Sequence, residues 1–190
     1  LISGNIFNQT QQLNPALITK FSKDAIFNLN EVATAKFSTN FNLILSKKLK
    51  IKKFDSITDL KLKNSRVKIS NEKINELFSE QFIDLKDHEV KITYNTTNKI
   101  DDYYLLINGK GFYKLDKDLD EIKYLIKKKN KSIYVDANIE LNNKEFNINK
   151  INFVKERKSP AEIKTKFVYN KNKNTHFSEI IFKNNKNTII

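Results

Sequence analysis

The chain has 190 residues, a formal net charge of +13 at pH 7, 39% hydrophobic residues and no cysteine. The length suffices for one domain with a hydrophobic core, and the lack of cysteine excludes disulfides, thiolate catalysis and thiolate metal sites. Of the 35 basic residues only Arg66 and Arg157 are arginines, the side chain that phosphate and base recognition favours. We therefore expect no nucleic-acid partner.

The first 36 residues have the least regular pattern. Leu1 to Phe7 predicts a short strand, and Asn14 followed by Pro15 predicts the start of a helix, with Asn14 as the N-cap. The chain opens without Met and ends on the apolar run at 187–190, and no stretch is as long and apolar as a membrane span. We expect an internal piece of a longer protein that begins with an irregular or helical lead-in at 1–36.

Apolar and polar residues alternate from Phe37 onwards, which is typical of strands with one dry face. The apolar residues that share one side of this pattern stand at odd-numbered positions: Phe37, Phe41, Leu43 and Leu45. The same spacing continues at Leu49 and Ile51, within a lysine-rich stretch. Further short strands with polar connections are predicted around Leu60, Leu62, Val67 and Ile69.

A second helix is predicted between Glu72 and Phe82, where apolar residues change to i, i+3, i+4 spacing. The two-residue period returns at Val90, Ile92 and Tyr94, and a long run follows from Tyr103 to Leu115. The sequence thus predicts a sheet that one short helix interrupts.

The clearest alternation is in residues 131–141, where Ile133, Val135, Ala137, Ile139 and Leu141 alternate with polar residues. Residues 121–129 fit a helix or a strand, and we favour a strand paired with 133–141 through a turn at 129–131. Asn142-Asn143 predicts a tight hairpin connection, because Asn tolerates positive φ. Later strands are predicted around Phe146 and Ile148, Ile151 and Phe153, Ile163 to Tyr169, and Ile180 to Phe182.

Nothing in the sequence divides the chain into two domains. It has only three glycines and two prolines, and it contains neither a linker nor a low-complexity boundary. We therefore predict a mainly β fold, in which residues 37–190 form one extended antiparallel sheet with one or two short helices.

Two polar motifs imitate ligand-binding loops. Gly109-Lys110-Gly111 lacks the third glycine and the helix of a dinucleotide loop, so we interpret these glycines as a bend in a sheet. Asp116, Asp118 and Asp120 resemble the start of a calcium loop, but Glu121 stands where that loop needs glycine. We expect a solvated acidic turn there.

The only imidazoles, His88 and His176, lie far apart in the sequence and without a metal-ligand spacing. We expect each to be a surface or strand-end residue. The adjacent carboxylates Asp101 and Asp102 would point to opposite faces of a strand and could not act together. The sequence therefore predicts no enzyme, no cofactor and no metal.

The 14 phenylalanines and seven tyrosines fall largely on the apolar parity of these strands. They fit the core of a closed sandwich, and they fit equally an open groove for acyl chains, which needs only a continuous dry surface. Both alternatives require the same alternation, so the sequence leaves them open.

The long alternating strands, the low glycine content and the lysine-rich outer positions resemble the AsmA-like superfamily. The segments that carry the resemblance are IKKFDSITDLKLKNSRVKIS, LLINGKGFYKL and SIYVDANIELNNKEFNINKINF. They are most similar to the middle region of the YhdP-type and TamB-type bridge-like lipid transfer proteins of Gram-negative bacteria.

The resemblance implies a curved β-groove in the periplasm, anchored to the inner membrane through a segment outside this sequence, that moves phospholipid towards the outer membrane. It implies two partners, phospholipid acyl chains and flanking segments of the same chain, and no catalytic residue. The lipid-facing residues that it implies are Phe41, Leu43, Leu45, Val90, Ile92, Ile133, Val135, Ile139, Leu141, Phe146 and Ile148.

Two alternatives remain open. One is a non-catalytic β-sandwich or repeat module with a structural or interaction role, in which the apolar face is only a core. The other is a groove for lipopolysaccharide.

Overall fold

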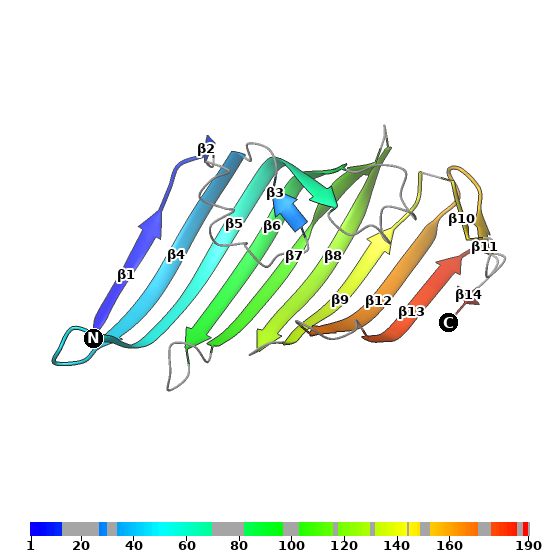
Figure 1. The fold of residues 1–190 in the computed structure, drawn as a ribbon. Helices are drawn as coiled ribbons and strands as arrows, with labels where there is room; N and C mark the ends of the chain where they lie inside the picture. Colours follow the sequence, from blue (N-terminus) through cyan, green and yellow to red (C-terminus); the bar gives the residue numbers. More distant parts are fainter. Residues whose placement is uncertain are drawn as a thin grey trace.

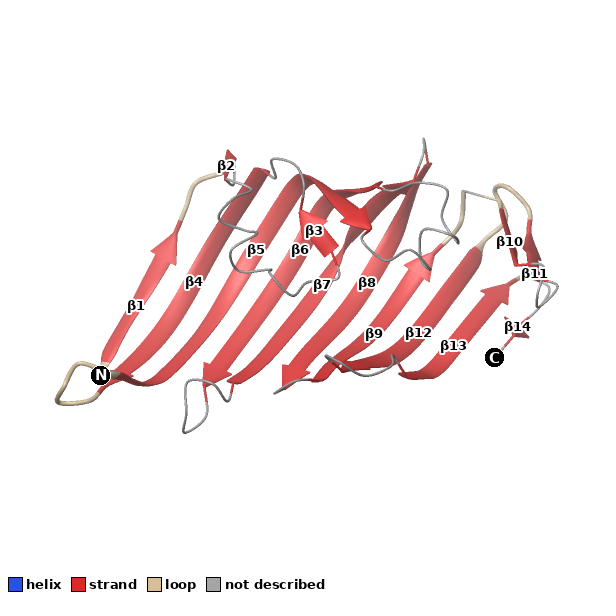
Figure 2. Cartoon of the chain, in the orientation of Figure 1, coloured by secondary structure: helices blue, strands red, loops and turns tan. Residues whose placement is uncertain are grey.

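We describe the fold from a computed structural model, which covers residues 1–12, 27–29, 34–69, 82–96, 103–115, 118–129, 132–143, 145–148, 153–170, 176–185 and 188–189. Within these ranges every regular element is a β-strand (Figure 2). The strands follow from the sequence, because β-branched and aromatic residues that alternate with polar ones suit the pleated, half-buried surface of a sheet.

One antiparallel sheet dominates the structure (Figure 1). Its strands, in spatial order, are β1 (Ile2–Phe7), β4 (Thr34–Leu45), β5 (Ile51–Ile69), β6 (Phe82–Thr96), β7 (Tyr103–Leu115), β8 (Asp118–Lys129), β9 (Ser132–Glu140), β12 (Ala161–Asn170), β13 (His176–Asn184) and β14 (Thr188–Ile189). Two short strands lie off this path, β2 (Gln11–Gln12) beside β4 and β3 (Phe27–Leu29) beside β5. A separate two-stranded sheet is formed by β10 (Phe146–Ile148) and β11 (Phe153–Lys155).

The large sheet is open and curved, with β1 at one lateral edge and β13 and β14 at the other. The predicted mainly β, extended, curved antiparallel fold is confirmed.

Directly paired residues of neighbouring strands project to the same side of a sheet, and successive residues of one strand project to opposite sides. The register therefore divides the side chains into two faces. We call the first the apolar face; it includes Phe41, Leu43, Phe54, Leu60, Val90, Ile92, Ile107, Ile126, Val135, Ile139, Ile163 and Phe167. We call the second the charged face; it includes Lys53, Asp55, Lys61, Glu89, Lys110, Glu121, Lys123, Glu162, Lys164, Lys166 and Glu179.

A bulge in β6 changes which residues belong to the apolar face. The register between β6 and β7 shifts by one residue between Lys86 and Glu89, and Asp87 has a φ of 47° there. Val90 pairs with Gly109 of β7, and on the other side of the bulge Leu85 pairs with Tyr113. The apolar side of β6 is therefore formed by even-numbered residues at Val90 and by odd-numbered residues at Leu85. Because one extra residue exchanges the two faces of a strand, the bulge places Ile83 and Leu85 on the same side as Val90 and Ile92.

A small core lies at one end of the apolar face. Tyr113, Leu141 and Ala161 are buried and contact partly buried residues that include Ile122 and Ile139. The Tyr113 hydroxyl donates a hydrogen bond to the Glu140 carbonyl oxygen, and the Leu141 N–H donates to the Ala161 carbonyl oxygen at 2.9 Å. This cluster joins the end of β7 to the connection after β9 and to the start of β12.

Several sequence predictions are confirmed by the strand bounds. The expected strand at Leu1 to Phe7 is β1, the run from Tyr103 to Leu115 is β7, and the ambiguous residues 121–129 belong to β8, which pairs with β9 as expected. The helices expected after Asn14 and between Glu72 and Phe82 fall on residues outside the described ranges, except that Phe82 begins β6.

Three predictions about strands and their connections are wrong. The short strands expected around Leu60 and Val67 are one strand, β5. The strand expected to continue through Leu49 turns back there, because Ser46 accepts a hydrogen bond from Leu49 N–H at 3.0 Å and donates its own N–H to the Lys50 carbonyl oxygen. Asn142 and Asn143 do not connect a hairpin, since β10 pairs with β11 and not with β9.

Candidate functional site

The apolar face carries a continuous row of side chains across the sheet. Pairing from β1 to β13 places Ile6, Thr39, Thr58, Ile92, Ile107, Ile126, Val135, Phe167 and Phe177 side by side. The two polar members satisfy each other, because the hydroxyl oxygens of Thr39 and Thr58 lie 2.8 Å apart in a hydrogen bond. Apart from this hydrogen-bonded pair, every member of the row is apolar.

Aromatic rings form a second line near the end of the sheet where β4 turns into β5. Phe41 and Phe54 have ring centroids 6.3 Å apart, Phe54 and Tyr94 5.9 Å, and Tyr94 and Tyr103 are stacked at 5.3 Å. The Lys128 ammonium lies 5.3 Å from the centre of the Tyr103 ring. This line thus combines apolar ring faces with phenol hydroxyls and one cation.

Two glycines of β7 allow rings to lie against its backbone. A Cβ atom at Gly109 would lie 2.2 Å from the Tyr124 ring, and one at Gly111 would lie 2.5 Å from His88 Nδ1. Neither glycine has positive φ, so both serve close approach and not a turn. The interpretation of Gly109-Lys110-Gly111 as a sheet bend is thereby refined, because the glycines make room for Tyr124 and His88.

His88 is a residue whose position the sequence did not reveal. The expectation of a surface or strand-end position is wrong, since His88 lies within β6 at 1% exposure. Burial lowers its pKa, although a hydrogen bond between Nδ1 and the Lys86 carbonyl and the nearby Asp87 carboxylate oppose this shift. Among the residues that the structure describes, Nε2 has no hydrogen-bond partner. His176 is exposed at the start of β13, as expected.

The apolar face is buried at its centre and exposed at both lateral edges. Val90 and Ala137 retain 7% and 8% of their surface, whereas Ile6 in β1 retains 55% and Phe177 in β13 retains 51%. Exposed apolar side chains at the edge of a face are where a hydrophobic ligand could enter.

The implied lipid-facing residues divide into three groups. Most lie on the apolar face of the large sheet: Phe41, Leu43, Leu45, Val90, Ile92, Ile133, Val135 and Ile139. Leu141 follows β9 and is buried in the small core. Phe146 and Ile148 belong to β10 in the separate two-stranded sheet, so they do not extend the rows of the large one. Contact of any of these residues with lipid stays a prediction.

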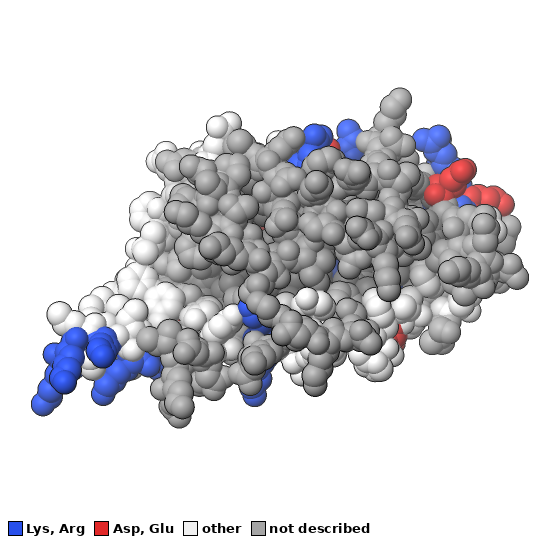
Figure 3. Space-filling model, in the orientation of Figure 1, with Lys and Arg blue, Asp and Glu red and all other residues white. Residues whose placement is uncertain are grey.

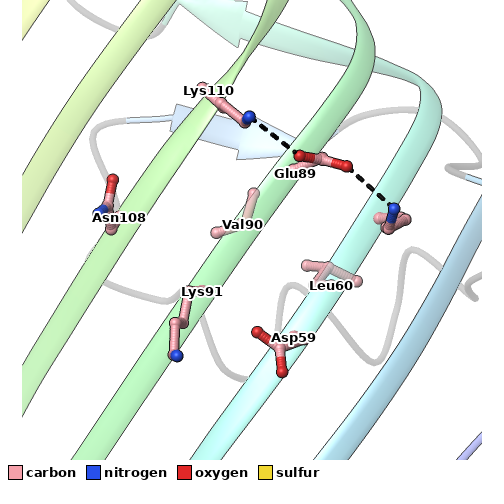
Figure 4. Close-up of a pocket in the computed structure, with 8 residues that line it drawn as sticks. Asp59, Leu60, Glu89, Val90, Lys91, Asn108 and Lys110 are labelled. Carbon is pink, nitrogen blue, oxygen red and sulfur yellow. Dashed lines mark hydrogen bonds and ion pairs between the residues drawn. The ribbon is translucent and has the colours of Figure 1, made fainter.

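The charged face carries several ion pairs. Glu89 accepts hydrogen bonds from Lys61 at 2.9 Å and ion-pairs with Lys110 at 3.3 Å, over a shallow hollow of about 370 Å³ (Figure 4). Hydrogen bonds from these two lysines lower the pKa of Glu89. Because its carboxylate is held by two cations at the surface, it is a poor general base, and the hollow is best explained as a solvated ion-pair site.

No metal site is formed by the residues that the structure describes. They contain no cluster of three potential metal ligands. Asp120, from the calcium-like run, is buried and accepts hydrogen bonds from Asn142 N–H at 3.0 Å and from Asn143 Nδ2 at 3.1 Å. It therefore fastens the connection after β9 to β8. In the same described ranges, no helix is long and apolar enough to cross a bilayer.

Comparison with known proteins adds no relative. No protein-family model matches the chain, and searches of characterised proteins and of solved structures found no match. Function is therefore inferred from the surfaces of the sheet.

Proposed function

We propose that this chain is a lipid-binding segment of an AsmA-like bridge protein of the periplasm, whose apolar face holds phospholipid acyl chains on their way between the inner and outer membranes. One observation carries the proposal: a single open sheet presents an apolar row from β1 to β13 that no second sheet covers in the described part of the chain. The charged face keeps the opposite side of the same sheet in water.

The dimensions of the row suit acyl chains. Neighbouring strands lie about 4.8 Å apart, so the nine strands of the row span about 38 Å. One acyl chain extends over half of a bilayer core of about 30 Å, so it is about 15 Å long. The row could therefore hold more than one chain end to end, as a conduit requires.

A photo-crosslinking residue tests the proposal directly. Val135 on the apolar face and Tyr134 on the charged face are neighbours in β9, so benzoylphenylalanine at either position samples opposite sides of one strand. In a Gram-negative host we expect position 135 to capture phospholipid and position 134 to capture none. Equal capture at both positions, or none at 135 in a folded variant, would contradict the groove.

A charge substitution at the same pair separates the groove from a second candidate, a structural module whose apolar face is only a core. The burial of Ala35 and Ala137 favours that second candidate. In an open groove, Val135→Lys should leave the chain folded and remove bound phospholipid, measured by mass spectrometry of extracted lipid, whereas Tyr134→Lys should change neither. In a closed core, Val135→Lys should unfold the chain, because it buries an unpaired charge.

A lipopolysaccharide groove would show in the same crosslinking experiment. Capture of lipopolysaccharide in place of phospholipid at position 135 would replace the proposed cargo and keep the groove.

A further inference from the structure

The turn between β4 and β5 combines exposed apolar side chains with exposed lysines. Leu49 retains 78% of its surface and Ile51 retains 45%. Lys47, Lys48, Lys50 and Lys52 surround them and are exposed. In the described part of the chain none of these four has an acidic partner, whereas Lys53 is paired with Asp55 at 2.7 Å. Figure 3 shows Lys and Arg side chains gathered at the end of the molecule where this turn projects.

The backbone at Leu49 is unusual as well. Its φ is 56°, the left-handed region in which glycine or asparagine is normally found. The residue lies in the connection at 46–50, where the Ser46 carbonyl oxygen accepts a hydrogen bond from Leu49 N–H and Ser46 Oγ accepts one from Lys50 N–H at 3.0 Å. Neither backbone preference nor packing explains a leucine at this position, and an outlier of this kind points to a function.

The apolar surface of the turn continues into the apolar face. Leu45 pairs with Ile51, and the next apolar pair along the two strands is Leu43 with Phe54. The line of aromatic rings that begins at Phe41 and Phe54 lies at this same end of the sheet. Tyrosine rings and lysine side chains are typical of protein surfaces at the membrane–water boundary.

We propose that the β4–β5 turn docks the protein on the surface of an anionic phospholipid bilayer. Leu49 and Ile51 enter the boundary between headgroups and acyl chains, and the four unpaired lysines bind the lipid phosphates. An anionic bilayer is the partner that fits, because it satisfies the exposed apolar residues and the uncompensated positive charge together. The docking does not depend on lipid binding by the apolar face.

Vesicle flotation of the 190-residue chain tests the docking. We expect binding to vesicles that contain phosphatidylglycerol, weak binding to phosphatidylcholine alone, and release by salt. Replacing three lysines, in Lys47→Gln/Lys48→Gln/Lys50→Gln, should weaken binding about 100-fold. The matched control Lys36→Gln/Lys91→Gln/Lys127→Gln removes the same charge from exposed positions of the sheet and should change binding less than about threefold. Equal losses in both variants, or no binding by the parent, would overturn the proposal.

Insertion of the apolar tip is tested separately. The chain has no tryptophan, so Leu49→Trp is a unique reporter whose emission should shift to the blue on anionic vesicles and be quenched by brominated lipid. Tyr134→Trp on the charged face should show neither change. Leu49→Asn suits the backbone at positive φ and should weaken binding about tenfold. An unshifted emission of the Leu49→Trp variant, together with full binding by Leu49→Asn, would overturn insertion of the tip.

Docking through the turn and lipid binding by the apolar face can be tested independently of each other. Val135→Lys should leave vesicle binding unchanged, and the triple lysine variant of the turn should retain any lipid bound to the apolar face. Loss of vesicle binding in Val135→Lys, in a folded chain, would contradict docking through the turn.

Discussion

Single residues at the centre of the apolar face set how closely the strands of this sheet pack. Tyr124 lies across Gly109, its direct partner on β7, and His88 lies against Gly111. A side chain at either glycine would displace the ring that lies against it. The ring of Tyr124 is shielded from solvent, and this burial raises the pKa of its phenol. Close approach of ring and backbone thus depends on the absence of one methyl group.

Gly109→Ala should destabilise the fold by about 1–3 kcal/mol, because the new Cβ overlaps the Tyr124 ring. Backbone strain should add little, since Gly109 does not have positive φ. Urea unfolding measures the difference. In a Tyr124→Leu background, where the ring is gone, the same substitution should cost less than about 0.5 kcal/mol. An equal cost in both backgrounds would show that the ring is not the cause.

His88 should make the stability of the fold depend on pH. Its pKa in the folded chain lies below the ordinary value of 6.5, so the unfolded chain binds the proton more tightly. The stability from His88 is complete above pH 6.5 and is lost as the pH falls through that value towards the folded pKa. Urea unfolding across this range measures the loss. His88→Phe keeps a ring over Gly111 and should remove this part of the pH dependence; an unchanged profile in that variant would assign it to other groups.

At the scale of elements, two irregularities determine which residues share a face. The bulge at Asp87 exchanges the parity of β6, and the turn that ends at Lys50 reverses the chain while Leu45 and Ile51 remain on one side. Neither place carries the glycine that usually marks such a feature. This explains why the alternation alone suggested an uninterrupted strand through Leu49.

The edge strand β1 is the element through which we expect two copies of the chain to associate. In the described part of the chain it pairs only with β4, and Ile2, Ile6 and Phe7 are exposed on it. We expect concentration-dependent self-association through this edge in sedimentation velocity. Ile6→Lys should weaken this self-association without unfolding the chain. The control is Phe112→Lys, at an exposed apolar position of the charged face away from the edge, and it should leave the self-association unchanged. Equal association in Ile6→Lys and the parent would exclude the β1 edge.

At the scale of the whole molecule, the two faces of the sheet separate two kinds of surface. Ion pairs such as Lys61–Glu89 and Lys166–Glu179 lie on one side, and the apolar row that includes Ile107 and Ile126 lies on the other. A high net charge and an extended apolar surface can therefore coexist in one chain, because each strand sends its charged and its apolar residues to opposite sides.

The sequence by itself determined the two faces of the strands with the clearest alternation. The alternation in 131–141 predicted which residues of β9 share a side, and the same period predicted β7 to the residue at both ends. Such predictions succeed because the pleat repeats every two residues within one strand, so the information is local. The same local pattern placed Val90 and Ile92 together on one side of β6.

Only the tertiary structure decided how those strands pair and whether the sheet closes. The burial of His88, the placement of Phe146 and Ile148 in a separate sheet, and the turn at Leu49 depend on partners that are distant in the sequence or on one irregular backbone position. Alternation is identical in an open sheet and a closed sandwich, because it records that one side of a strand is dry and not what lies against it.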